Sequence, residues 1–271
     1  MFEIENLWVK YDSSPIWALQ DVTIKASSNQ LIVVAGSSGC GKSTLAKTIL
    51  RLIPLFERAE TKGYIRIDGK DIAVLDRKAM VQTIGYVPQY PADFTTSLLV
   101  EEEIAFPLEN IGFTRENMKQ RIYYVLKQLD IAHLRTRLIT ELSSGELQKV
   151  ALATALAPLP PLLILDEPMA RIDSRTEIIL AMILKDLARK GHLVIAFEHR
   201  LEYLLPEADH VILLEKGKII AEGNPGQVLE QLVDVDLPEV AGIDSLKRRP
   251  LDLNDARELI LELVSTNTSS N

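Results

Sequence analysis

The sequence predicts an α/β fold built on a mainly parallel sheet with helices on both faces. Short apolar runs alternate with segments whose apolar residues recur every three or four positions, which is the pattern of βα units. One apolar run, Leu31 to Ala35, leads directly into a glycine-rich loop, and another, Leu162 to Leu165, ends in two carboxylates. The 271 residues suffice for one large domain with an appendage.

The strands are predicted from apolar or alternating runs, and two tight turns follow strands at Asp68-Gly69 and Lys216-Gly217-Lys218. The predicted strands are Phe2 to Val9, Trp17 to Ala26, Leu31 to Ala35, Gly63 to Ile67, Thr83 to Val87, Leu162 to Leu165, Leu193 to Phe197, Val211 to Leu214 and Ile219 to Ala221. One helix should begin near Lys42. The stretch from about 98 to 157 is helix-rich, because Thr114 to Leu129 and Ser144 to Ala157 carry apolar residues at helical spacing.

The tail beyond residue 225 is predicted to be a helical extension. Asn254-Asp255 is a plausible helix start, and the residues Ala256, Leu259, Ile260, Leu263 and Val264 that follow place apolar side chains on one face. That face either packs on the chain's own core or pairs with a second subunit. The chain after about residue 265 is small and polar, so we expect it to be frayed.

The glycine-rich loop has the composition of a phosphate-binding loop (P-loop). It comprises Gly36, Ser37, Ser38, Gly39, Cys40, Gly41, Lys42, Ser43 and Thr44. Its glycines let successive backbone N–H groups curl around phosphates, Lys42 would reach the β- and γ-phosphates of a nucleotide, and Ser43 would offer a hydroxyl to Mg²⁺. Cys40 is the only cysteine, so it forms no internal disulfide, and we interpret it as a small residue in a tight turn.

The carboxylates Asp166 and Glu167 complete the nucleotide chemistry. The carboxyl ends of parallel strands form the ligand crevice of such a sheet, so Asp166 can hold the Mg²⁺ that Ser43 contacts from the other side. Glu167, one residue further, can accept a proton from an attacking water. The predicted class is a nucleotide-hydrolysing enzyme.

Charge and hydropathy narrow the function further. The formal net charge of −8 argues against a sequence-independent grip on nucleic acid. No apolar run approaches the ~20 residues that span a bilayer, and the N-terminus lacks the pattern of a signal peptide. We therefore expect a chain that stays in the cytosol.

A further motif indicates the family. The segment Leu142-Ser143-Ser144-Gly145-Glu146-Leu147-Gln148 opens a predicted helix shortly before the Asp166-Glu167 strand, and it closely resembles the signature sequence of ATP-binding cassette (ABC) ATPases. Gln89, Asp173 and His199 stand in the order that this family shows, so the resemblance covers residues 1 to about 225. It implies a P-loop NTPase (RecA-like) core, an N-terminal antiparallel β subdomain, and a helical subdomain that carries the signature.

The resemblance also implies roles for individual residues. Two cassettes would associate head to tail, and each ATP would lie between one subunit's phosphate loop and the other's signature, represented by Ser143, Ser144, Gly145 and Glu146. Asp173 would belong to a dimer-interface loop, His199 would contact the γ-phosphate, and Gln89 would join the Mg²⁺ shell. Tyr11 lies where such cassettes place an aromatic that stacks on adenine, although a core tyrosine at a strand edge explains it nearly as well.

Two segments depart from the commonest family pattern. Ser144 replaces the usual first glycine of the signature, and Ala170-Arg171-Ile172-Asp173 replaces a more usual Ser-Ala-Leu-Asp loop. These departures leave ATP binding intact and affect the expected rate of hydrolysis. A weakly hydrolysing, nucleotide-sensing subunit is therefore one alternative function.

The segment after Gln89 resembles the ATPase subunits of energy-coupling factor (ECF) vitamin importers and of cobalt and nickel importers. The matching stretches are Gln89 to Asp93 and Val100 to Asn110. The resemblance implies a second ATPase subunit, identical or paralogous, a transmembrane coupling subunit, and a separate membrane subunit that recognises the substrate. The chain would lie peripherally on the cytoplasmic face of the membrane. The competing class is a soluble cassette that acts on DNA or ribosomes, but such proteins carry long coiled-coil insertions or two cassettes in one chain.

Overall fold

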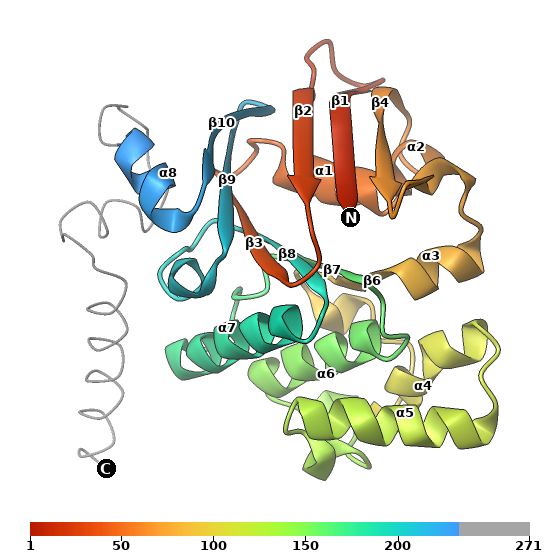
Figure 1. Ribbon diagram of the computed structural model, residues 1–271. Coiled ribbons are helices and arrows are strands. Elements are labelled where there is room, and N and C mark those ends of the chain that lie inside the picture. The colour runs from red at the N-terminus through yellow and green to blue at the C-terminus, as the bar shows by residue number, and fades with distance from the viewer. Residues whose placement is uncertain (233–271) are drawn as a thin grey trace, which may run out of the picture.

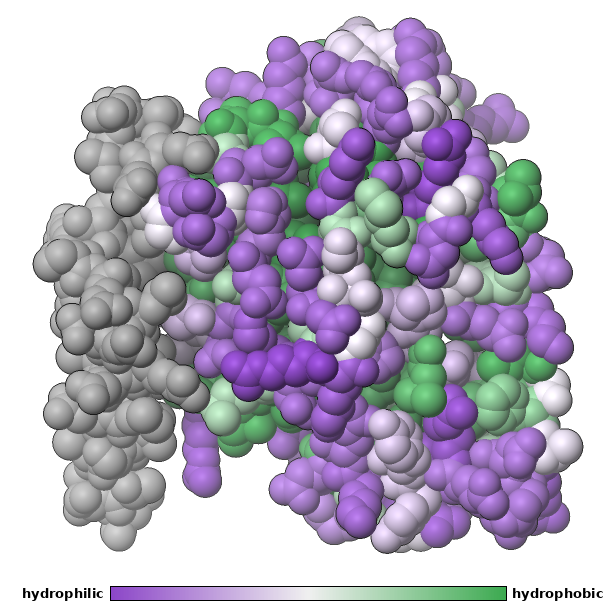
Figure 2. Space-filling view, in the orientation of Figure 1, coloured by the Kyte–Doolittle hydropathy of each residue, from purple (hydrophilic) through white to green (hydrophobic). Residues whose placement is uncertain are grey.

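The computed structural model describes residues 1–232 of the chain. The predicted tail helix that begins near Asn254 lies outside the described residues. Within them, two sheets and their helices form the layers seen in Figure 1. Figure 2 shows that one face of the molecule is mostly hydrophilic, with small separate apolar areas.

The first sheet is the antiparallel N-terminal unit that the family resemblance implied. Its strand order is β2-β1-β4-β5, with β1 at Phe2–Tyr11, β2 at Leu19–Ala26, β4 at Ala59–Ile67 and β5 at Lys70–Asp71. The predicted turn at Asp68-Gly69 joins β4 to β5, with φ of 49° and 77° at these two residues. Two successive positive φ values define the tight hairpin turn that matches the twist of the flanking strands.

The second sheet is the mainly parallel core. Its order is β10-β9-β3-β8-β7-β6, with β3 at Gln30–Ala35, β6 at Ile84–Val87, β7 at Leu162–Asp166, β8 at Leu193–Glu198, β9 at His210–Glu215 and β10 at Lys218–Gly223. All neighbours pair in parallel except β9 and β10, which form the predicted hairpin. The strands β3, β7 and β8 are buried on both faces, which explains why their sequences read as unbroken apolar runs.

The helices cover the two faces of this core unequally. One face packs against the N-terminal sheet and α1 (Lys42–Ile49), and the other packs against α4 (Val100–Asn110), α5 (Arg115–Gln128), α6 (Ser144–Leu156) and α7 (Ser174–Arg189). The remaining α-helices of the described residues are α2 (Leu52–Leu55), α3 (Arg77–Thr83) and α8 (Pro225–Leu232). The predicted helix-rich segment therefore corresponds to α4, α5 and α6, which lie together on one side of the sheet (Figure 1).

Two local predictions need correction. Thr83, predicted to begin a strand, is the last residue of α3, where its hydroxyl donates to the Ala79 carbonyl oxygen at 2.6 Å. The β4 strand begins at Ala59, four residues before the predicted Gly63, because antiparallel pairing with β1 extends it. Sequence reasoning also missed α3 and α7, although Asp76 and Asp173 cap them.

Candidate nucleotide-binding site

Three loops meet at one edge of the core sheet, because the parallel neighbours β3, β8 and β7 all end there. The loop after β3 contains the predicted phosphate loop, the loop after β7 contains Asp166 and Glu167, and the loop after β8 contains His199. Ala35 pairs with Glu198, and Asp166 pairs with Phe197, so the three loops leave the sheet at nearly the same level. The fold thus brings these predicted residues together.

The phosphate loop is held in a tight curl that requires glycine. A Cβ on Gly36 would lie 2.3 Å from the Leu214 carbonyl oxygen, and Gly41 has φ of 119°. Gly41 is also the N-cap of α1 and offers no capping side chain, so the first amide N–H groups of the helix donate no hydrogen bond to an N-cap side chain. These amides and the positive end of the helix dipole form an anion-binding arrangement.

The Lys42 side chain lies inside this curl. It is only 5% exposed, and its Nζ donates to the carbonyl oxygens of Gly36 at 2.7 Å and Ser37 at 3.0 Å. Cys40 is buried next to it, with Sγ 4.0 Å from Nζ. A buried ammonium within a ring of backbone groups is suited to a polyphosphate ligand.

Tyr11 ends β1 close to the first turn of α1. Its hydroxyl lies 3.1 Å from Thr44 Oγ1, and its ring packs against the apolar cluster that includes Val9 and Leu45. These contacts support the interpretation of Tyr11 as a core residue at a strand edge. Stacking on adenine stays a prediction.

Asp166 occupies the end of β7, where burial and the neighbouring Glu167 raise its pKa to about 6. The positive charge of Lys42 acts in the opposite direction and is the largest influence that lowers this pKa. The carboxylate of Asp166 is thus held in an environment that is short of positive charge. A cation at this position would stabilise its ionised form.

Glu167 connects two other predicted residues. Its carboxylate accepts a hydrogen bond from Gln89 Nε2, and its Oε1 lies 3.5 Å from His199 Nδ1. Its backbone N–H donates to the Phe197 carbonyl oxygen at 2.8 Å, and its φ of 46° is unusual for a residue other than glycine. Gln89, Glu167 and His199 therefore form one contiguous polar cluster, which we term the Gln89–Glu167–His199 cluster.

The donor set that we predicted for Mg²⁺ fits that ion. Ser43, Gln89 and Asp166 supply a hydroxyl, an amide oxygen and a carboxylate, and a hard divalent cation prefers such oxygen ligands. Within residues 1–232, no three or more His, Cys, Asp or Glu side chains gather to hold a metal on their own. A site with a single carboxylate and the phosphate oxygens of a nucleotide is consistent with this finding.

The signature residues lie at the start of α6. Ser143 is the N-cap and forms a capping box with Glu146: Ser143 Oγ accepts from the Glu146 N–H at 3.3 Å, and the Ser143 N–H donates back to Glu146 Oε2 at 2.9 Å. Hydrogen bonds from the Ser143 backbone and hydroxyl lower the pKa of Glu146 below its ordinary value. Ser143 and Ser144 are exposed residues, and the Ser143 hydroxyl also donates to Glu146 Oε2 at 2.8 Å.

The signature also contacts the loop of Asp173. Gly145 is buried against Thr176, and a Cβ there would lie 2.8 Å from Thr176 Cγ2. Asp173 is the N-cap of α7 and accepts from the Thr176 N–H at 3.1 Å and from its hydroxyl at 2.7 Å. The structure thus joins the signature to the Asp173 loop. Both stand at the starts of helices, α6 and α7, that pack on the face of the sheet opposite α1.

Sequence reasoning assigned no role to Glu198, which the structure places beside His199. The sequence did contain a signal for this residue, because a charged glutamate ends the otherwise apolar β8 strand. A buried Glu177 in contact with Arg200 was likewise missed.

The fold and the site define a P-loop nucleotide-binding protein. Residues 19–170 match the family described as ABC transporter. A Treponema denticola protein described as an ABC transporter ATP-binding protein is 35% identical over 95% of this chain and 51% of its own length, and one from Pyrococcus abyssi is 32% identical over 86% of this chain and 83% of its own. The chain therefore belongs to the ABC transporter family, and it spans about half the length of the Treponema relative.

Solved structures agree with this assignment. cbiO1 from Clostridium perfringens, described as part of the ABC transporter complex cbiONQ, superposes with a TM-score of 0.75 and 26% identity over 85% of this chain and 93% of its own. An ATP-binding cassette of an ABC transporter in its ADP conformation gives a TM-score of 0.74 and 26% identity over 89% of this chain and 97% of its own. The predicted ABC ATPase fold is thus confirmed, and the match to cbiO1 supports the ECF resemblance.

Up to residue 232, no helix combines the length and the apolar character needed to cross a bilayer.

Proposed function

We propose that the chain is the ATP-binding and ATP-hydrolysing subunit of a membrane importer of the ECF type, which takes up a vitamin or a transition metal. The observation that carries this proposal is the Gln89–Glu167–His199 cluster beside the phosphate loop. A protein that only binds nucleotide needs no such cluster, whereas a hydrolase needs a proton acceptor and a polar partner where water attacks.

In the proposed mechanism the chain contributes mainly position and charge. Lys42 and the first amides of α1 hold the phosphates, and Glu167 accepts the proton of the attacking water. His199 contacts the γ-phosphate, and Gln89 holds Glu167 through its amide group. Ser43, Gln89 and Asp166 would hold Mg²⁺, which when bound neutralises charge on the phosphates.

Head-to-tail association of two cassettes is part of the proposal. The exposed residues Ser143 and Ser144 stand at the start of α6, which packs on the face of the core sheet opposite α1. A nucleotide on this chain's phosphate loop is therefore within easier reach of another cassette's signature. A dimeric ATP-binding cassette solved with ADP and Pi resembles this chain, with a TM-score of 0.69 and 25% identity over 83% of it. ATP would close the dimer, and hydrolysis would reopen it.

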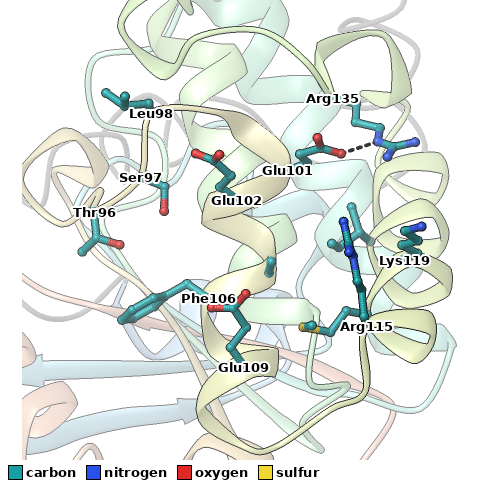
Figure 3. A pocket seen from close by; sticks show the side chains of 13 residues that line it. Thr96, Ser97, Leu98, Glu101, Glu102, Phe106, Glu109, Arg115, Lys119 and Arg135 are labelled. Carbon is teal, nitrogen blue, oxygen red and sulfur yellow. Dashed lines mark hydrogen bonds and ion pairs between the residues drawn. The ribbon is translucent and has the colours of Figure 1, made fainter.

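A surface groove formed by residues that follow Gln89 in the chain supports the proposal that the protein docks on a membrane partner. It has a volume of about 680 Å³ and is lined by the segment before α4, by α4 and by the start of α5. Figure 3 shows Glu101 and Glu102 on α4 and Arg115 and Lys119 on α5, and the dashed line marks the 2.6 Å ion pair between Glu101 and Arg135. Large apolar side chains are exposed at and beside this groove: Phe94, Leu98 and Phe106 are 61%, 73% and 45% exposed. Apolar exposure of this kind marks an interaction surface.

The proposal is tested by identifying the proteins that copurify with this chain. The tagged chain is isolated from its native host after solubilisation of the membranes in a mild detergent, and mass spectrometry identifies its partners. Recovery of polytopic membrane proteins, with or without a second ATPase, supports the importer. Recovery of ribosomes or DNA-associated proteins alone supports the competing class of soluble cassette.

A matched pair of variants sharpens this test. Leu98→Glu places a charge in the groove and should abolish recovery of the membrane proteins, while ATP binding is kept. Tyr123→Glu changes a similarly exposed apolar residue on α5 that does not line the groove, and it should leave recovery unchanged. Equal recovery with both variants would contradict docking at this groove.

A further inference from the structure

Glu198, the last residue of β8, is a fully buried carboxylate: 0% of it is exposed. Its Oε1 accepts the backbone N–H groups of His199 at 2.8 Å and Arg200 at 3.1 Å, and its Oε2 accepts the N–H of Met169 at 3.2 Å. A single side chain thus links the loop that contains His199 to the loop that follows Glu167.

The same carboxylate also lies against the imidazole of His199. The Nδ1 atom of His199 is 3.3 Å from Glu198 Oε1 and 3.5 Å from Glu167 Oε1. Nδ1 is buried, and neither contact has the geometry of a hydrogen bond. One edge of the ring is therefore enclosed by two carboxylates, one from each loop, and both favour a ring orientation that turns an N–H toward them.

The cost of burying the Glu198 carboxylate indicates that its hydrogen bonds to both loops have a specific role. Burial raises the pKa of Glu198, so a carboxylate here is costly to ionise, and the three backbone N–H groups offset that cost. A neutral hydroxyl side chain could cap the two amides of His199 and Arg200, but it is too short to reach Met169 as well. The carboxylate is suited to holding both loops and the ring together.

A second anchor lies on the far side of His199. Arg200 Nη1 is 3.1 Å from Glu177 Oε1, and Glu177, in the first turns of α7, is only 1% exposed. The backbone on both sides of the imidazole is thus tied to the loop and helix that follow Glu167. These contacts restrain the backbone that carries the His199 ring relative to the loop of Glu167.

We propose that Glu198 is a positioning residue for ATP hydrolysis, which holds the His199 imidazole in a fixed orientation beside Glu167 by fastening the loops after β7 and β8 to each other. The inference rests on the proposed roles of His199 and Glu167. Glu198 itself does not contact the nucleotide in this account. It acts through His199, so its effect should vanish when His199 is absent.

The test is a double-mutant cycle on the full chain, assayed with the partner subunits with which it copurifies. Glu198→Gln keeps the size of the side chain but turns an amide N–H₂ toward backbone donors, so we expect kcat for ATP to fall about ten- to a hundredfold, as misplacement of a reacting group does. The KM for ATP and the affinity for a non-hydrolysed ATP analogue should stay unchanged. In a His199→Ala background the same change should lower kcat little further.

Two controls separate positioning from a general loss of stability. Asp209→Asn removes a carboxylate that accepts the Leu31 N–H at 2.8 Å, at the opposite end of β3 from the phosphate loop, and it should leave kcat unchanged. Glu198→Asp keeps the buried charge but withdraws it by one methylene, so it should also lower kcat. This variant replaces Glu198→Gln in the test if Glu198→Gln does not fold. In the wild-type chain, the amides of Met169, His199 and Arg200 should exchange slowly with deuterium.

The outcomes are distinct. Wild-type kcat in either Glu198 variant, an equal loss of kcat with and without His199, or rapid exchange of the three amides would overturn the positioning role while the ATPase stands. Absence of ATP turnover in the wild-type complex would overturn the proposed function, and the inference with it.

Discussion

Replacing Asp166 by Asn should stabilise the ligand-free protein while abolishing Mg²⁺-dependent turnover. The carboxyl of Asp166 has a pKa raised to about 6 from an ordinary value of 3.8, first because it is buried and second because Glu167 lies next to it. A raised folded-state pKa means that folding favours the protonated form. Ionisation of Asp166 at neutral pH therefore destabilises the fold, and a neutral isostere removes that cost.

The magnitude and its pH window follow from this shift. A change of about two pKa units corresponds to about 3 kcal/mol, and partial exposure of Asp166 to solvent reduces the expected gain to about 1–2 kcal/mol. In the wild type, the stability that comes from protonated Asp166 is fully present below pH 3.8 and is lost as the pH rises through about 6, so the full advantage of the neutral variant appears only above that range. The Asp166→Asn variant should thus melt about 2–8 °C above wild type at pH 7.5 and at the same temperature near pH 4.

The assay is a series of thermal melts of both proteins between pH 4 and 8, in the presence of a chelator and without nucleotide. Asp130→Asn, at an exposed turn after α5, serves as the control and should melt like wild type at each pH. An Asp166→Asn variant that melts at or below the wild-type temperature at pH 7.5 would refute the reasoning. So would a gap in melting temperature that does not shrink toward pH 4.

Three further predictions concern the other parts of the site. Lys42→Ala should weaken ATP binding about tenfold or more, because a buried cation inside the loop is lost; unaltered affinity by calorimetry would count against the phosphate-loop assignment. Glu167→Gln should still bind ATP and accumulate closed dimers while turnover falls about 10²- to 10⁴-fold, and undiminished turnover would remove Glu167 from the role of base. Gly145→Ala should cost about 1–3 kcal/mol of stability, since its Cβ would lie 2.8 Å from Thr176 Cγ2, and adding Thr176→Ser should recover part of the loss in chemical denaturation.

Much of the fold was predictable because its signals are local. The buried strands β3, β7 and β8 read as short apolar runs, since both of their faces are covered. The predicted turn at Asp68-Gly69 depends on the backbone conformation of only two residues. Helix α7 was missed although its apolar residues recur at helical spacing, and Thr83 was misplaced because a β-branched residue beside an apolar run is typical of a strand.

The sequence by itself determined the chemistry of this protein: the phosphate loop from Gly36 to Thr44, the carboxylates at 166 and 167, and the signature from Ser143 to Glu146. These motifs are contiguous, and each demands particular residue types, so they can be recognised without coordinates.

Only the tertiary structure decided which of these groups contact each other. Contacts between residues far apart in the chain depend on strand order and on register, which no short segment encodes. The β3-β8-β7-β6 order brings His199 beside Glu167 and Gln89 beside Glu167, and it places α6, which the signature opens, on the face of the sheet opposite α1.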